Sequence, residues 1–89
     1  MYVHNVYSEE ISVMQHDPIR SAIGKNIRHY RRTRQLKQYE LAEKAACRPN
    51  LLSRIERGLT TPSISLLLRI AQALNCAITD LLAEPPSTI

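Results

Sequence analysis

Helix-breaking residues divide most of this chain into short segments. Pro18, Pro49 and Pro62 recur along it, and Gly58 stands between the last two. Between these breaks, apolar residues follow one another at intervals of three or four, which is the period of an amphipathic helix. Proline is tolerated in the first turn of a helix and glycine is favoured just after the last turn, so these residues predict helix boundaries. The pattern predicts several short helices that pack together.

The expected helices cover residues 18–32, 38–45, 49–57, 64–74 and 79–83. Asp17 and Ser63 are suitable N-caps, and Asn75 can take a left-handed conformation at a helix end. Because no strand pattern appears in this region, the expected fold class is all-α. A chain of 89 residues is long enough for one small domain.

The helical spacing also predicts which side chains face the core. These are Ile19, Ile23, Ile27, Tyr30, Leu41, Ala42, Ala45, Cys47, Leu52, Ile55, Ile64, Leu67, Leu68, Ala71 and Leu74. Leu51 and Leu66 fall where solvent is expected, either as scattered surface residues or as part of an interface.

Residues 1–16 differ from the rest because their apolar side chains have no helical spacing. This N-terminal extension is either a disordered tail or a strand that pairs across a dimer. Met14 is also a candidate natural start. The domain itself is expected over residues 17–84, with a C-terminal tail at 85–89.

The charge is concentrated in one block. Residues 20–57 hold eleven Lys and Arg against three Glu, whereas both flanks are mildly acidic. Such a block indicates a polyanionic partner on one face, although a solvated helical surface has the same composition.

Several classes of site are not expected. Cys47 and Cys76 are too few for a disulfide framework, and the histidines have no metal-ligand spacing with them. Neither a catalytic set of residues nor a phosphate-cradling glycine loop is present, so we expect no enzyme activity, metal or cofactor. With no apolar run as long as a membrane span, the chain is expected in the cytoplasm and away from membranes.

Residues 38–57 read as one unit, a short helix, a turn and a second helix that crosses it, which is a helix-turn-helix. The outward positions of the second helix are polar or basic apart from Pro49, and this suits a surface that meets DNA.

At this point the sequence resembles the Xre/Cro/C1-type helix-turn-helix family of bacterial and phage transcriptional regulators. The resemblance extends over residues 23–82. It rests on the segments Gln38-Tyr39-Glu40-Leu41-Ala42, Leu52-Ser53-Arg54-Ile55-Glu56-Arg57-Gly58 and Leu67-Leu68-Arg69-Ile70-Ala71 in order. It implies a compact five-helix, lambda-repressor-like DNA-binding domain.

The resemblance also implies roles for individual residues. The base-reading positions are Arg48, Pro49, Asn50, Ser53 and Arg54, of which Asn50 and Arg54 are the strongest candidates. The phosphate contacts are Lys37, Gln38, Arg57, Thr60 and Thr61. Arg31 and Glu56 form an internal ion pair. The cluster of Arg28, Arg31, Arg32 and Arg34 is either a second phosphate-binding edge or a solvated helix end.

The sequence departs from the family at three positions. Ala46 stands where the turn commonly has glycine, and a left-handed alanine costs about 1 kcal/mol or more, so a reshaped turn is expected. Lys37 and Arg48 replace the usual Ser or Thr caps, and neither side chain can accept a backbone hydrogen bond.

The expected function is that of a sequence-specific double-stranded DNA-binding transcriptional regulator. It would act as a homodimeric repressor or controller on a near-palindromic operator, without a small-molecule effector. The alternative is an antitoxin-type interaction module that blocks a partner toxin through residues 1–16 and regulates its own promoter.

Overall fold

The computed structural model describes residues 17–86, and this part of the chain folds into five α-helices without a strand. The helices are α2 (Pro18–Thr33), α3 (Gln38–Lys44), α4 (Pro49–Glu56), α5 (Ile64–Leu74) and α6 (Ile78–Leu82). The expected all-α fold is confirmed, with the helix ends displaced by no more than one residue. Within residues 17–86, no helix is long and apolar enough to span a membrane.

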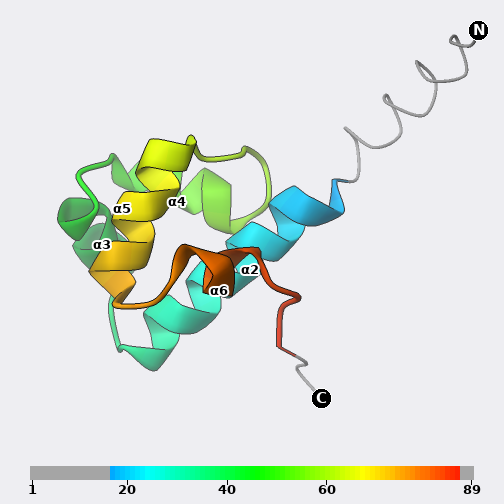
Figure 1. The fold of residues 1–89 in the computed structure, drawn as a ribbon. Coiled ribbons are helices and arrows are strands. Elements are labelled where there is room, and N and C mark those ends of the chain that lie inside the picture. Colours follow the sequence, from blue (N-terminus) through cyan, green and yellow to red (C-terminus); the bar gives the residue numbers. More distant parts are fainter. Residues whose placement is uncertain (1–16, 87–89) are drawn as a thin grey trace, which may run out of the picture.

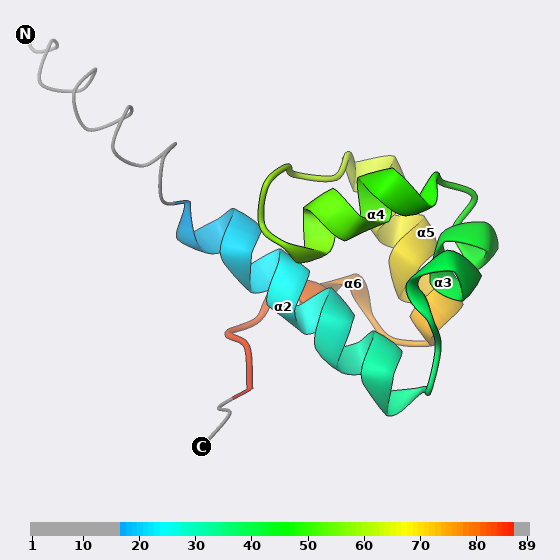
Figure 2. The ribbon, with the colours of Figure 1, turned by 180° about the vertical axis from the view of Figure 1, so that it is seen from behind.

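Helix α2 is the longest of the five helices, and α4, α5 and α6 contact it (Figures 1 and 2). It packs against α4 and α6, while α3 packs against α4 and α5. Helix α6 lies in front of α2 in Figure 1, and α4 lies in front of α5 in the reverse view of Figure 2. This arrangement leaves α3 and α4 together on one side of the domain.

The core is a single cluster of aliphatic side chains from all five helices. Ile27, Leu41, Leu52, Ile55, Ile70, Leu74 and Leu81 are its largest fully buried members. Tyr30, Cys47 and Cys76 are partly buried and pack against this cluster.

Three expected core residues are at the surface instead. Ile19, Ile64 and Leu68 are 65%, 79% and 46% exposed. Leu66, expected in solvent, is only 5% exposed. Apolar residues surround most of α5, so several faces fit a helical period, and its neighbours α3 and α6 select a face rotated by about 60° from the expected one.

Four helices end in the same hydrogen-bonded turn. A left-handed residue follows each of α2 to α5, namely Gln35, Ala46, Gly58 and Asn75. In each turn the next residue donates its N–H to a carbonyl five positions back, as Cys47 does to Ala42 at 2.9 Å. This is the Schellman motif. The prediction that Ala46 reshapes its turn is wrong, because Ala46 takes the left-handed conformation at φ 58° despite its Cβ.

Helix ends are also capped by side chains. The Asp17 carboxylate accepts the N–H of Ile19 at 2.9 Å, and the Ser63 hydroxyl accepts that of Leu66 at 3.1 Å, as expected for N-caps. At the opposite ends, Arg69 Nε donates to the Ala45 carbonyl at 2.9 Å. Free helix-terminal groups therefore help to hold neighbouring helices together.

Asn26 is a buried polar residue that the helical spacing did not single out. Its Nδ2 donates to the carbonyls of Leu81 and Ala83, at 2.9 and 2.7 Å. These carbonyls lie at the end of α6. One amide group therefore attaches α6 to α2 and satisfies polar atoms that burial would otherwise leave without partners.

Candidate nucleic-acid interface

Helices α3 and α4 form a helix-turn-helix joined by residues 45–48. Leu41, Ala42 and Ala45 are buried on the first helix and turn, and Leu52 and Ile55 are buried on the second. These small and aliphatic side chains pack in the core, so α4 is held firmly against the body along one side.

The other side of α4 faces solvent. Among the expected base-reading residues, Arg48, Pro49, Asn50 and Arg54 are exposed, and Ser53 is half-buried. No segment of the described chain covers this side, which carries amide, hydroxyl and guanidinium groups. Such groups pair with the edges of bases in a DNA major groove.

The expected phosphate contacts surround the same side. Lys37 and Gln38 are at the start of α3, and Arg57 is the C-cap of α4, where its Nε donates to the Ser53 carbonyl at 3.3 Å. Thr60 and Thr61 lie in the loop that follows. Lys37, Arg57 and Thr61 are exposed, whereas Gln38 and Thr60 are half-buried.

Glu56 lies at the end of α4 as a fully buried carboxylate, with 0% of its side chain exposed. Arg31 of α2 binds it through two hydrogen bonds, Nε to Oε2 at 2.6 Å and Nη2 to Oε1 at 3.0 Å. A third bond, from Arg31 Nη1 to the Leu36 carbonyl at 2.9 Å, holds the guanidinium in place. This fork geometry is the strongest form of Arg–carboxylate pairing.

Two further side chains reach the same carboxylate. Gln38 Nε2 donates to Glu56 Oε1 at 3.0 Å, and Arg28 Nε lies 3.6 Å from that oxygen. Sequence reasoning missed both contacts. The only available signal was that Arg28 precedes Arg31 by one helical turn. The contact with Gln38 gives this residue a structural function at the α3–α4 junction in addition to its expected phosphate contact.

Gly24 explains how α2 approaches α4 so closely. A Cβ at this position would meet the carbonyl oxygens of Ile55 and Glu56 at 2.4 and 2.6 Å, well inside contact distance. Because these are backbone atoms, they cannot move aside as a flexible side chain would. The glycine therefore lets α2 lie directly on the C-terminal end of α4, next to the buried carboxylate.

The two unusual cap residues have no side-chain cap bond. Lys37 and Arg48 both have extended N-cap backbones, and neither side chain accepts a hydrogen bond from its helix. In α3, Glu40 compensates in part, because its carboxylate accepts the N–H of Lys37 at 2.7 Å. Both cap positions carry positive charge where the helix-turn-helix meets solvent.

The cysteines are not poised for nucleophilic chemistry. Burial raises the pKa of the Cys47 thiol above its usual value, and Arg69 offsets part of this increase. Burial and Asp80 raise the pKa of Cys76, with a smaller opposing effect from Arg34. Both thiols are therefore protonated at neutral pH and act as small packing groups. Within residues 17–86, no three His, Cys, Asp or Glu side chains gather as a metal site.

Known proteins are similar to this chain in sequence and in fold. The HTH_3 helix-turn-helix family model matches residues 27–81. The chain is 40% identical over 67 residues to the HTH-type transcriptional regulator SinR of Bacillus subtilis, covering 74% of this chain and 60% of SinR. It is 37% identical over 62 residues to the immunity repressor protein of Bacillus phage phi105, covering 70% of this chain and 43% of that protein. The chain thus spans less than two thirds of the length of these relatives.

Solved structures agree with the sequence relatives. The clp gene regulator ClgR of Corynebacterium glutamicum superposes with a TM-score of 0.70 at 34% identity, over 72% of this chain and 68% of ClgR. The restriction-modification controller protein C.AhdI of Aeromonas hydrophila superposes with a TM-score of 0.68 at 26% identity, over 70% of this chain and 94% of C.AhdI. The matched region contains α3, α4 and the Arg31–Glu56 pair, and the chain belongs to the HTH_3 helix-turn-helix family.

Proposed function

We propose that this protein is a sequence-specific double-stranded DNA-binding transcriptional regulator. The observation that carries the proposal is the exposed side of α4, which presents Asn50 and Arg54 to solvent while Leu52 and Ile55 anchor the helix in the core. An α-helix held in this way fits the major groove of B-DNA. Relatives named as a transcriptional regulator and an immunity repressor support the same function.

In the proposed complex, α4 lies in the major groove with its N-terminal half toward the bases. Asn50 would pair with an adenine and Arg54 with a guanine, each through two hydrogen bonds. Arg48, Pro49 and Ser53 complete the contact with base edges. Pro49 has no N–H donor, so it can contribute only an apolar contact, such as one with a thymine methyl group.

Contacts with phosphates would fix the position of α4 without selecting a sequence. Lys37 and Arg57 supply charge on either side of the helix, and Thr60 and Thr61 supply hydroxyl donors. Gln38 can contribute through its amide while Glu56 holds it at the start of α3. Binding of this kind weakens steeply as salt concentration rises.

The protein is proposed to act in the cytoplasm as a homodimer on a near-palindromic operator, where two copies of α4 enter successive major grooves about 34 Å apart. It would repress by covering a promoter, or activate by touching polymerase from an adjacent site. This is occupancy rather than catalysis. Neither a cofactor nor an effector is required.

A second candidate function is that of an antitoxin that blocks a protein partner and regulates its own promoter. It is supported by 39% identity over 62 residues to the antitoxin PezA of Streptococcus pneumoniae, which covers 39% of that protein. The proposed partner-binding segment, residues 1–16, lies outside the described residues. Removing residues 1–16 would abolish capture of a toxin while preserving operator binding, whereas a regulator alone needs only the operator.

A pair of matched variants tests the DNA-reading proposal. The operator is first obtained by selecting bound fragments from random duplex DNA. Arg54→Ala should weaken operator binding by about 1–3 kcal/mol and relax selectivity at one base pair, since a bidentate base contact is lost. Lys37→Ala, the control, should weaken operator and random DNA by equal factors. Equal losses on both DNAs for Arg54→Ala would refute base reading by this residue.

A further inference from the structure

Helix α2 carries a row of basic side chains beside the helix-turn-helix. Lys25, Arg28 and Arg32 follow one another at intervals of three and four residues, so they share one face of the helix. Lys25 and Arg32 are exposed, and the Arg28 side chain is 40% exposed. We call these three residues the α2 basic row.

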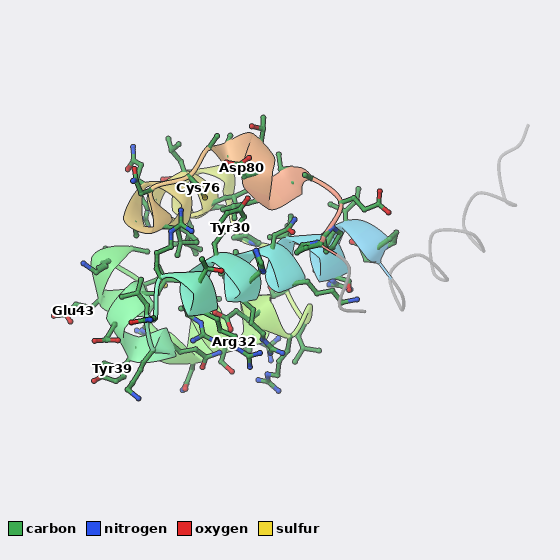
Figure 3. All side chains as sticks on the ribbon, turned by 90° about the horizontal axis from the view of Figure 1, so that it is seen from below. Tyr30, Arg32, Tyr39, Glu43, Cys76 and Asp80 are labelled. Atoms are coloured by element: carbon green, nitrogen blue, oxygen red, sulfur yellow. The ribbon has the colours of Figure 1, made fainter. Side chains whose placement is uncertain are left out.

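The structure separates this row from the other arginines of the same helix end. Arg31 is buried on Glu56. Arg34 turns to the opposite side, where its Nε donates to the Leu74 carbonyl at 2.7 Å and its guanidinium lies 5.1 Å from the centre of the Tyr30 ring. In Figure 3, Arg32 lies on the side of α2 that faces α3 and α4, whereas Tyr30 points toward α6.

The contacts of α2 place the row next to α4. Gly24 lies on the carbonyls of Ile55 and Glu56, and Arg28 Nε is 3.6 Å from Glu56 Oε1. The row therefore borders the C-terminal end of α4, where Arg54 and Arg57 are also exposed. The carboxylate at this border, Glu56, is buried and bound mainly by Arg31, with Arg28 at its edge. Lys25 and Arg32, the two exposed ends of the row, therefore carry most of its charge at the surface.

We propose that the α2 basic row binds the sugar-phosphate backbone of the duplex that α4 reads, as a second electrostatic contact outside the helix-turn-helix. This inference rests on the proposed DNA-binding function. Charge complementarity favours a polyanion, and the border shared with α4 favours the DNA that α4 would engage. The outer residues of the row are seven positions apart, about 10 Å along a helix, and one strand of B-DNA rises about 3.4 Å per phosphate. The row can therefore meet up to about three phosphates.

The test measures how the association constant for operator DNA and for random duplex DNA depends on salt concentration. Lys25→Gln and Arg32→Gln should each lower the slope of log K against log salt by about 0.9 per subunit, because one counterion fewer is released. Between 50 and 200 mM salt, that slope corresponds to about a 3.5-fold smaller loss of affinity per substitution. Both DNAs should be affected equally, because phosphate contacts carry no sequence information.

Arg34→Gln is the matched control, because it removes the same charge from the same end of α2 but on the side of Tyr30. Its slope should equal that of the wild type. Thermal unfolding followed by circular dichroism checks that each variant is folded. If the wild type binds DNA but Lys25→Gln and Arg32→Gln keep its slope, the row is a solvated surface and the inference is wrong.

If Lys25→Gln and Arg32→Gln weaken binding to the operator but not to random DNA, the inference is also wrong. That result would show that these side chains read bases. If the wild type itself shows no salt-dependent DNA binding, the proposed function fails before the α2 basic row is tested. The two failures are therefore distinguishable.

Discussion

At the scale of single residues, Glu56 of α4 binds side chains from two other helices, α2 and α3. It receives hydrogen bonds from Arg31 of α2 and Gln38 of α3 while it belongs to α4. A buried carboxylate is costly to desolvate, and these donors are what make its burial tolerable. The same charge group therefore positions both helices of the proposed DNA-binding unit.

Arg31→Ala should lower the free energy of unfolding by about 3–5 kcal/mol, because it leaves a buried charge without its main partner. The measurement is urea denaturation followed by circular dichroism. Arg32→Ala is the control, since Arg32 is exposed on the same helix and its loss should change stability by no more than about 0.5 kcal/mol. Similar unfolding curves for the two variants would contradict a structural role for the ion pair.

The resemblance to the family implied the Arg31–Glu56 pair, but not the contacts of Arg28 and Gln38 with the same carboxylate. A buried Arg calls for an opposite charge, and few carboxylates are available to provide it. The hydrogen bond from Gln38 and the ion pair with Arg28 depend on how closely α2 and α3 approach α4. That distance is a property of the packed structure and leaves no periodic signal in the sequence.

At the scale of helices, the contact between α2 and α4 depends on a position without a side chain. The physical reason for a glycine at position 24 is visible only when the carbonyls of Ile55 and Glu56 are in place. Glycine inside a helix normally lowers helix stability. Here that cost is outweighed by the close approach of two helices.

Gly24→Ala should destabilise the domain by about 3 kcal/mol, because the added methyl group overlaps backbone atoms of α4 and overpacking is costly. Thermal unfolding provides the measurement. Lys25→Ala, at the next position on the exposed face, should change stability by about 0.5 kcal/mol or less. If Gly24→Ala is as stable as the wild type, the two helices can separate freely and their contact does not position α4.

Arg48, the N-cap of α4, provides a test of whether this position adds positive charge for DNA binding at the expense of helix stability. Arg48→Ser should raise the free energy of unfolding by about 1 kcal/mol, because the serine hydroxyl can accept a backbone N–H that Arg48 does not. The same variant should bind the operator more weakly, because a positive charge and a proposed base contact are lost. Denaturation and operator titration measure the two effects.

Ser63→Ala is the reciprocal control, because it removes the hydrogen bond that caps α5 and should cost about 1 kcal/mol. An Arg48→Ser variant with unchanged stability would mean that the start of α4 is already satisfied. Unchanged operator affinity would instead remove Arg48 from the proposed contacts.

At the scale of the whole molecule, the proposed homodimer makes the spacing between half-sites a geometric constraint. Inserting five base pairs at the centre of the operator rotates one half-site by about half a turn of a duplex with about 10–10.5 base pairs per turn. The second subunit then faces away from its half-site. Affinity should fall by about 100-fold or more as the bivalent advantage is lost.

A gel-shift titration checks this spacing prediction, with a centre of unchanged length and altered sequence as the control DNA. Equal affinity for the original and the lengthened operator would contradict paired binding. It would instead indicate that each subunit binds its half-site independently.

The set of helices and the positions of their ends follow from local signals in the amino-acid sequence. Pro18, Pro49, Gly58 and Ser63 act on their own backbone or on the next turn, so their effects are local and legible in order along the chain. The motif of α3 and α4 was predictable for the same reason, since its apolar and outward positions follow one helical period.

The packing of the helices against one another sets which face of α5 is buried, which arginines of α2 stay on the surface and which side chains reach Glu56. Leu66 and Leu68 are chemically alike, yet one is in the core and the other in solvent. Arg31, Arg32 and Arg34 are neighbours in sequence, yet they face a carboxylate, solvent and the Tyr30 ring. These outcomes depend on where other helices lie, and contacts between residues distant in sequence have no fixed spacing along the chain.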